Sequence, residues 1–503
     1  MGPNIQRRAF LQTSAALGLG AGLGLPARLI TPARGEAMVV KPDAVRLRPE
    51  IEPVVRWIEE TPRDKILDTA VGHLKSGLSY RELMAGLFLA GIRNIKPRPV
   101  GFKFHAVMVI HSAHLLGQTA EVGERLLPML WALDVFKSSQ AADVREGDWT
   151  LGNVDETHLP KPSQAKAEFV KAMEAWDADA ADAATASLCR SAGAAEVMEP
   201  FWRYAIRDQR NIGHKAIFAA QSWRTLQTIG WPNAEPVLRS LAFGILDREG
   251  DKGLTSVGPY DANLALSKTI TEDWTRGRPN LPAVAKLVEV LREAKPAAAS
   301  AEIAAMLNRG ISPESLWDAI LMAGSELLLR KPGIIALHAM TSANALHYIY
   351  GASGDDTTRK LALLQAAAWV AMFRDAIGGA PLFALETMSA NRVEAARSED
   401  LNDIFTTIAT SRQKAAQKAF DYVSNGGSPE SIFAMGRKLI FHKGTDSHDY
   451  KYAAAAWEES VLASDPHVRH ILTAAAMGHF PSSTEKDSPL MDRAREAVAK
   501  VLS

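Results

Sequence analysis

Four histidines recur at corresponding positions in two parts of the chain, and this spacing limits the fold more than any other feature. His105 and His338 are 233 residues apart, and His214 and His448 are 234 residues apart. We therefore expect two homologous halves that each contribute two histidines to one central site. Other residues follow the same two shifts: residues 77–79 correspond to 310–312, His114 to His347, residues 193–196 to 427–430, and Arg203 to Arg437.

The pattern of apolar residues predicts helices along most of the chain, and the alternation typical of strands is nearly absent. Residues 79–82, Ser-Tyr-Arg-Glu, match a capping box in front of an apolar helix. Ser312 and Ser428 each precede a proline and an acidic residue, which is typical of a helix start. The fold class is therefore predicted to be all-α. Three alanine-rich segments also favour helix: 164–198, 296–308 and 452–463.

The domain organisation follows from the repeat. We expect residues 38–503 to form a single all-α domain built from two halves, at about 50–250 and 283–500. Two stretches rich in glycine and proline, 137–165 and 249–282, interrupt the helical pattern. Stretches of that length are usually lids, binding loops or linkers, and the second is predicted to join the halves.

The first 37 residues match a cleavable twin-arginine signal peptide. Gln6-Arg7-Arg8 is followed by an apolar, glycine-rich stretch at residues 13–25 and by a small-residue cleavage site, Gly35-Glu36-Ala37. The apolar stretch is too short to span a bilayer well, so we expect no stable membrane anchor. The twin-arginine export machinery is therefore a predicted partner, and the periplasm or another exported location is the predicted site of action.

Composition excludes several classes of partner and cofactor. Basic and acidic residues number 57 each. Removing residues 1–37, with four basic residues and one acidic, leaves 53 against 56. No basic stripe or tail is present, so nucleic acid is not expected as a partner. Because Cys189 is the only cysteine, a disulfide, a cysteine-ligated zinc and an iron–sulfur cluster are all excluded.

Four imidazoles at matched positions suggest a metal site. The alternative is that each histidine caps a helix or binds a buried carbonyl in a duplicated helical protein. His114 and His347 each lie nine residues after a proposed ligand, on the opposite helix face, so we expect them to be packing or outer groups. His111 corresponds to Asn344 and is expected to make a local hydrogen bond. The other histidines considered have no partner in the repeat and are predicted to be surface or loop residues: His158, His467, His470 and His479.

Lys451 breaks the symmetry between the halves, because the corresponding residue is Ile217. On a helix, Lys451 and His448 are three residues apart and share a face. An ammonium group has no lone pair for a metal. A lysine that faces a cation must be deprotonated, or be converted by carbon dioxide into an anionic carbamate with two oxygen donors. The alternative is a surface salt bridge.

Four short runs resemble motifs of the questin oxidase-like family. This family contains non-haem iron oxygenases that oxidatively open anthraquinone rings. Its metal is held by four histidines and a carboxylated lysine in an all-helical fold. The runs lie between residues 104 and 460 and occupy residues 104–105, 213–217, 337–346 and 446–451.

This resemblance implies a ligand set. The run around the first histidine fits the family pattern least well, so His111 is a rival to His105 as first ligand. The known members act in fungal polyketide pathways, whereas this chain carries a bacterial export leader. The resemblance implies that Lys451 is the carboxylated ligand, with a part in catalysis, and that the imidazole ligands are His105, His214, His338 and His448.

Three functions from different classes are compatible with these features. The first is an exported non-haem iron oxygenase or oxidase that uses dioxygen on an aromatic or other electron-rich small molecule. The second is a metal-dependent hydrolase in which zinc activates water. The third is a helical binding or scaffold protein with structural histidines. Iron (Fe²⁺) is the expected metal, although four imidazoles also accept copper or zinc. The chain has no dinucleotide fingerprint, so electrons would come from the substrate or an external donor.

Overall fold

The computed structural model describes residues 43–248, 258–379, 381–391 and 398–502. Within these ranges the regular structure is helical, apart from two isolated β-bridges, Ala44 with Gly152 and Arg278 with Ile311. The prediction of an all-α fold is therefore confirmed. The predicted signal peptide at 1–37 lies outside the described residues.

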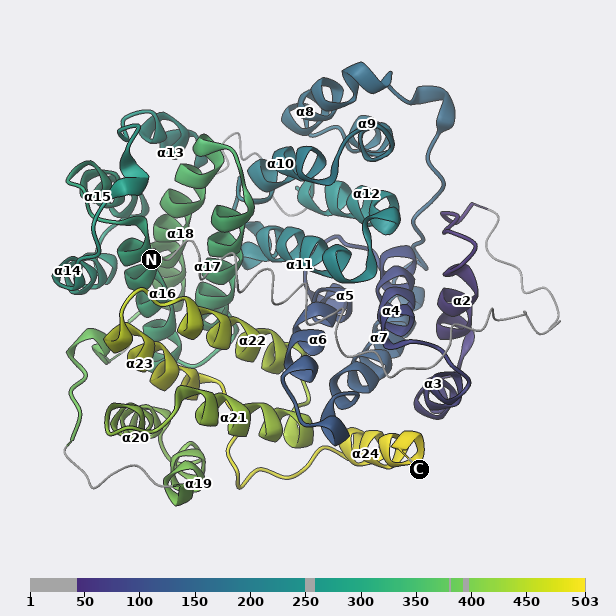
Figure 1. Ribbon diagram of the computed structural model, residues 1–503. Coiled ribbons are helices and arrows are strands. Elements are labelled where there is room, and N and C mark those ends of the chain that lie inside the picture. Colours follow the sequence, from purple (N-terminus) through teal and green to yellow (C-terminus); the bar gives the residue numbers. More distant parts are fainter. Residues whose placement is uncertain (1–42, 249–257, 380, 392–397, 503) are drawn as a thin grey trace. The chain divides into compact units, whose positions relative to one another are not determined.

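The helices before residue 249 include several short ones (Figure 1). Short 3-10 segments connect some of them, including η1 (Phe102–Phe104) and η5 (Arg210–Gly213). The α-helices in this part are α2 (Glu52–Glu60), α3 (Ile66–Lys75), α4 (Tyr80–Asn94), α5 (His105–Met108), α6 (Ile110–Gln118), α7 (Leu127–Arg145), α8 (Ala165–Ala175), α9 (Ala178–Ser191), α10 (Ala194–Ala205), α11 (His214–Ile229) and α12 (Ala234–Ile245).

The helices after residue 257 are on the whole longer. The sequence is rich in alanine and leucine here, which lose little side-chain freedom in a helix. They are α13 (Tyr260–Ser267), α14 (Leu281–Leu291), α15 (Pro296–Asn308), α16 (Pro313–Arg330), α17 (Ile334–Ala352), α18 (Asp356–Ile377), α19 (Ser398–Thr407), α20 (Arg412–Ser424), α21 (Pro429–Lys443), α22 (Ser447–Leu462), α23 (Pro466–Ala475) and α24 (Pro489–Leu502).

The chain divides into two compact units whose limits differ from those of the two sequence halves. The first unit comprises residues 1–201, 221–250 and 489–503, and the second comprises 202–220 and 251–488. The unit limits therefore fall inside α10 and α11. As a result, His214 belongs to the second unit although it lies in the first half of the sequence.

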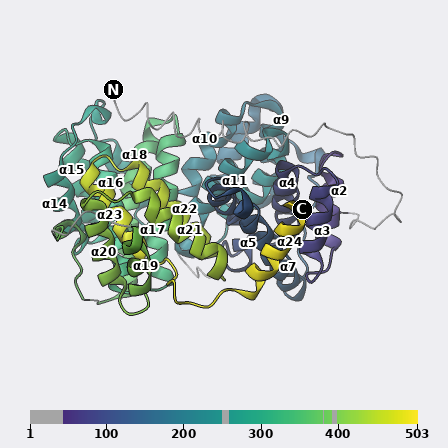
Figure 2. The ribbon, with the colours of Figure 1, turned by 60° about the horizontal axis from the view of Figure 1, so that its bottom comes forward.

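Each unit has its own core of packed helices. In the first unit α2 packs on α4, α9 packs on α8 and α12, and α24 packs on α3 and α7. In the second unit α17 packs on α16, α18 and α22, and both views show α14, α15, α16 and α18 side by side (Figures 1 and 2). The second core includes the fully buried rings of Trp317 and Trp369.

The predicted helix starts agree with the structure. Ser79 forms both hydrogen bonds of a capping box with Glu82. Ser312 caps α16 and Ser428 caps α21, each followed by a proline in the first turn. These side chains accept hydrogen bonds from amides that a helix leaves unpaired, which is why the pattern is readable in sequence.

The two predicted interruptions are shorter than expected. Residues 137–145 continue α7, because the first glycine of that stretch is Gly147. In the second interruption, residues 249–257 lie outside the described ranges, but α13 begins at Tyr260, directly after Pro259. A proline next to a helix start is compatible with the helix, since the first turn needs no amide donor there.

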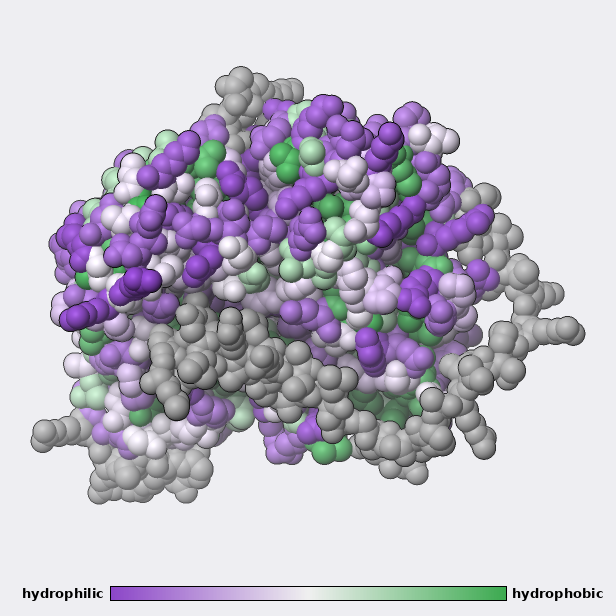
Figure 3. All heavy atoms as spheres, turned by 45° about the horizontal axis from the view of Figure 1, so that its top comes forward, coloured by the Kyte–Doolittle hydropathy of each residue, from purple (hydrophilic) through white to green (hydrophobic). Residues whose placement is uncertain are grey.

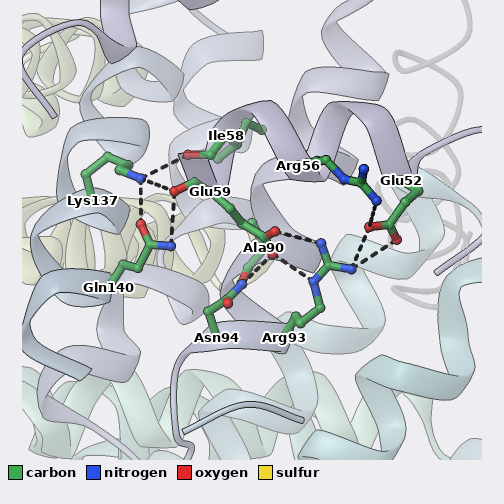
Figure 4. A network of polar contacts seen from close by, with 9 residues as sticks. All are labelled: Glu52, Arg56, Ile58, Glu59, Ala90, Arg93, Asn94, Lys137 and Gln140. Carbon is green, nitrogen blue, oxygen red and sulfur yellow. Dashed lines mark hydrogen bonds and ion pairs between the residues drawn. The ribbon is translucent and has the colours of Figure 1, made fainter. Parts of the chain in front are cut away.

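A buried charge network joins α2 to α4 in the first unit (Figure 4). The Arg93 side chain is 2% exposed and its guanidinium forms ion pairs with Glu52 and Glu59 at 2.8 and 2.7 Å. Nearby, the Lys137 ammonium donates to the carbonyls of Ile58 and Glu59 near the end of α2. A cation at the end of a helix is stabilised by the unpaired carbonyls.

The face shown in Figure 3 is mostly hydrophilic, and hydrophobic side chains are scattered over it. Among the described residues, none of the helices combines the length and the apolar character needed to cross a membrane.

Candidate metal centre

Three of the predicted ligands meet in the second unit, on three different helices. His214 begins α11, His338 lies in the first turns of α17, and His448 is the second residue of α22. One ring nitrogen from each lies within 4.8 Å of those of the other two. All three side chains are buried, with exposed fractions of 3%, 0% and 8%.

Each of these imidazoles is held through its Nδ1 atom. The Nδ1 of His214 lies 2.5 Å from the carbonyl oxygen of Asn211, and that of His338 lies 2.7 Å from the carbonyl oxygen of Ile334. The Nδ1 of His448 lies 2.5 Å from Oδ1 of Asp446. These oxygens only accept, so each Nδ1 carries the hydrogen and each neutral ring keeps its lone pair on Nε2. Outer partners of this kind orient metal-binding histidines.

The Nε2 atoms point toward one another. The Nε2 atoms of His214 and His338 are 2.9 Å apart. The ring centres of His214 and His338 are 4.4 Å apart, and those of His338 and His448 are 5.1 Å apart, with the rings steeply inclined in both pairs. The three lone pairs therefore converge on a small volume.

The electrostatic environment keeps these rings neutral. Burial, and next the charge of Lys451, holds the pKa of His214 and of His338 well below the ordinary range. Burial also lowers the pKa of His448, although its hydrogen bond to Asp446 acts in the opposite direction. A neutral imidazole is the form that binds a metal.

A strained turn sets the position of His214. Asn211, Ile212 and Gly213 all have positive φ, at 56°, 50° and 81°. This conformation is uncommon for asparagine and an outlier for a β-branched residue such as isoleucine. The turn places the Asn211 carbonyl against the His214 ring. A side chain at Gly213 would meet Ser342, since an added Cβ would lie 2.6 Å from the Cβ of that residue.

The corresponding turn before His448 is built differently. Asp446 caps α22 and forms a capping box with Asp449. Oδ1 of Asp446 accepts from both the backbone amide and Nδ1 of His448. One carboxylate thus fixes the helix start and the orientation of the ring, whereas a backbone carbonyl orients the ring of His214.

Lys451 is buried, in contrast to the alternative of a surface salt bridge. Its side chain is 3% exposed, one turn after His448 on α22. Burial lowers the pKa of its ammonium to about 7, against an opposing effect of Asp446. Much of this lysine is therefore the free amine at neutral pH, and the amine is the form that carbon dioxide converts to a carbamate.

His105 and His111, the two candidates for the first ligand, have different surroundings. His105 is the first residue of α5, in the first unit, and is half-buried. His111 lies on α6 in the same unit, where burial, and next the charge of Arg224, holds its pKa well below the ordinary range. A neighbouring guanidinium disfavours a metal cation at His111.

The remaining histidines have ordinary partners. His114 Nδ1 lies 3.1 Å from the hydroxyl of Tyr80, and His347 Nδ1 lies 2.7 Å from Glu459. His158 is exposed, as predicted. His467 and His470 do not lie in a loop but on α23, half-buried against Phe420, and His479 is half-buried 3.1 Å from Asp449.

Sequence reasoning missed the groups that orient the rings. Asp446 is the first residue of the run 446–451, and its position two residues before a histidine at a helix start is a signal for this role. The turn at residues 211–213 has no comparable signal, because an asparagine followed by an isoleucine does not predict positive φ at both residues. No protein-family model, curated protein or solved structure was found to match the chain.

Proposed function

We propose that this protein is an exported non-haem iron oxygenase or oxidase that acts on an aromatic or other electron-rich organic molecule. The observation that carries the proposal is the contact between Nε2 of His214 and Nε2 of His338 at 2.9 Å. Both Nδ1 atoms donate to backbone carbonyls, so two lone pairs face each other in a buried site. Two such lone pairs repel unless a cation lies between them.

We propose that the cation between the two Nε2 atoms is a metal ion and not a shared proton. A shared proton would charge one of two imidazoles that are 3% and 0% exposed. Burial and the neighbouring lysine oppose that charge and lower both pKa values. A metal that binds three nitrogens repays the cost of desolvation through direct bonds. The structural alternative, in which histidines only pair with carbonyls, leaves the convergence of the Nε2 atoms unexplained.

His105 is proposed as the fourth imidazole, because the repeat extends from single residues to whole helices. The shift that carries His105 to His338 also carries the N-cap Ser79 of α4 to the N-cap Ser312 of α16. Helices that pack together in the first half of the sequence correspond to helices that pack together in the second half. The matching pairs are α2·α4 with α14·α16, α4·α7 with α16·α18, α8·α9 with α19·α20, and α9·α12 with α20·α23.

A buried ion pair supports the same repeat. Glu59 and Arg93 pair at 2.7 Å in the first unit. The shift of 233 carries them to Arg292 and Glu326, which pair at 2.6 Å in the second unit. The charges are exchanged but the two positions are retained. A contact that survives exchange of both partners supports descent of the two halves from one ancestor.

Lys451 is proposed to be carboxylated and to supply the negative charge of the ligand set. Four neutral imidazoles leave a divalent ion with its full charge, and one carbamate lowers this to about +1. Its place one turn after His448, its burial and its lowered pKa support the assignment. An ammonium at this position would instead repel the metal.

The metal is proposed to be iron, as the resemblance to the questin oxidase-like family implies, although imidazoles also bind zinc and copper. Iron would supply redox chemistry with dioxygen, while the buried histidines hold it in a dry site.

The proposal is tested by metal analysis and oxygen uptake on the chain produced with its own residues 1–37. We expect about one iron per chain, export that fails when Arg7 and Arg8 become lysines, and oxygen consumption with a panel of electron-rich aromatics. Bound zinc without oxygen uptake would support the hydrolase. A chain that binds no metal would support the structural alternative.

A further inference from the structure

Several buried polar atoms in the first unit have no hydrogen-bond partner among the described residues. Two of them are Nδ1 of His111 on α6 and Oε1 of Gln221 on α11. The Gln221 side chain is 7% exposed, and its amide nitrogen donates weakly to Ser112 at 3.3 Å. Ser222 Oγ, on a fully buried side chain, also has no hydrogen-bond partner among the described residues. Orphaned groups of this kind are costly unless something else pairs with them.

At the corresponding positions of the second unit, the polar side-chain atoms named below have hydrogen-bond partners or are absent. His111 corresponds to Asn344, whose amide donates to Glu458 at 2.7 Å and to Glu459 at 2.8 Å. Gln221 corresponds to Ala455, which has no polar side-chain atom. The polar side chains at these positions are thus paired in one half of the repeat, whereas the other half has polar atoms without a partner among the described residues.

We infer that the buried region around His111 on α6 and Gln221 on α11 binds a small, uncharged, hydroxyl-bearing organic molecule. A hydroxyl both donates and accepts, so it can serve an imidazole nitrogen and an amide oxygen. Arg224, whose charge acts on His111, opposes a cation there. The Gln221 oxygen opposes an anion. This inference does not depend on the metal.

Burial of the site supports a ligand that leaves bulk water. Ser112, Gln221 and Arg224 are 1%, 7% and 6% exposed. Pockets for small molecules are mostly enclosed and use few polar groups to fix orientation. A buried water would satisfy the same atoms, so the experiment must separate a water from an organic hydroxyl.

The test compares phenol with toluene, which lacks the hydroxyl, by isothermal titration of the full-length protein. We expect the wild type to bind phenol at least tenfold more tightly than toluene. His111→Leu and Gln221→Met should each weaken phenol binding about tenfold and change toluene binding little. His158→Leu, at an exposed histidine, is the matched control and should change neither.

A second variant fills the proposed site with the hydrogen-bonded pair found at the corresponding positions of the second unit. His111→Asn combined with Arg224→Glu builds the pair found at Asn344 and Glu458, and it should abolish phenol binding while the melting temperature stays near that of the wild type. His338→Ala should bind phenol normally, which separates this site from the metal centre. Equal binding of phenol and toluene, or unchanged phenol binding in both single variants, would show a buried water only and overturn the inference.

Discussion

At the scale of the residue, Lys451 offers the sharpest separation between a ligand and a structural amine. Lys451→Arg should lose most of the bound metal, because a guanidinium stays protonated and forms no carbamate. Lys451→Ala should lose metal as well. The matched control is Lys137→Arg, at a lysine with 8% exposure whose ammonium donates to backbone carbonyls and to Gln140. Wild-type metal content in Lys451→Arg, measured by mass spectrometry of the metal, would remove Lys451 from the site.

Asp318 gives a prediction about pH. Burial raises the pKa of its carboxyl from 3.8 to about 7, although Ser464 donates to it. Between these values the folded protein keeps a proton that the unfolded chain has lost. This contribution to stability is present below about pH 4 and lost as the pH rises through 7, by at most about 1.4 kcal/mol per pH unit. The urea midpoint of Asp318→Asn should therefore rise relative to the wild type from pH 4.5 to 7.5, and a constant difference would contradict the assignment.

Single residues also show what the sequence can and cannot reveal. The repeat spacing singled out His214, His338 and His448, which lie within 4.8 Å of one another. On the proposed repeat, equivalent positions of the two halves carry equivalent side chains. The acceptors for their Nδ1 atoms were not predictable, since two are backbone carbonyls whose direction depends on local φ and ψ. The burial of Lys451 was also open, because a lysine is usually exposed.

At the scale of the element, the turn before α11 yields a prediction with a close control. Gly213→Ala should destabilise the fold and lower metal affinity, because the added Cβ would lie 2.6 Å from Ser342 and 3.5 Å from Trp369. Gly310 has the same φ of 81°, but an added Cβ there meets nothing within 4 Å. Gly310→Ala should therefore cost only the strain of positive φ, about 1 kcal/mol. Equal effects of the two variants on metal affinity would contradict a role for this turn.

Helix starts were easier to predict than helix ends. Ser79, Ser312 and Ser428 cap helices as expected, since a cap needs a side chain at one position. The stretches at 137–165 and 249–282 were predicted to interrupt the helical pattern, and parts of both are helical. Glycine and proline mark where a helix stops being favourable, but packing decides how far the neighbouring helix extends before that point.

At the scale of the whole molecule, the exchanged ion pair provides a test of the repeat. Glu59→Arg alone and Arg93→Glu alone should each destabilise the fold by about 3 kcal/mol or more, because each leaves like charges together in a largely buried place. The double exchange recreates the order found at Arg292 and Glu326, so it should be more stable than either single variant. Chemical unfolding of the four proteins gives the coupling. A double variant as unstable as the sum of the singles would contradict equivalence of the two positions.

The all-α class was predictable from periodicity and composition, but the division into units was not. The sequence suggests a boundary between the halves, whereas residues 202–220 group with the second half and 489–503 with the first. Periodicity reports which face of a helix is buried and not which helices bury it. Because residues 202–220 belong to the second unit, His214 lies in the same unit as His338 and His448.

The most direct test of the central claim is the metal content of histidine variants purified after export. His214→Ala, His338→Ala and His448→Ala should each lose most of the metal, because the freed position fills with water. His105→Ala should do the same, and His111→Ala and the exposed control His158→Ala should keep about one metal per chain. Full metal content in His214→Ala and His338→Ala, or a wild type without metal, would contradict a metal centre at these residues.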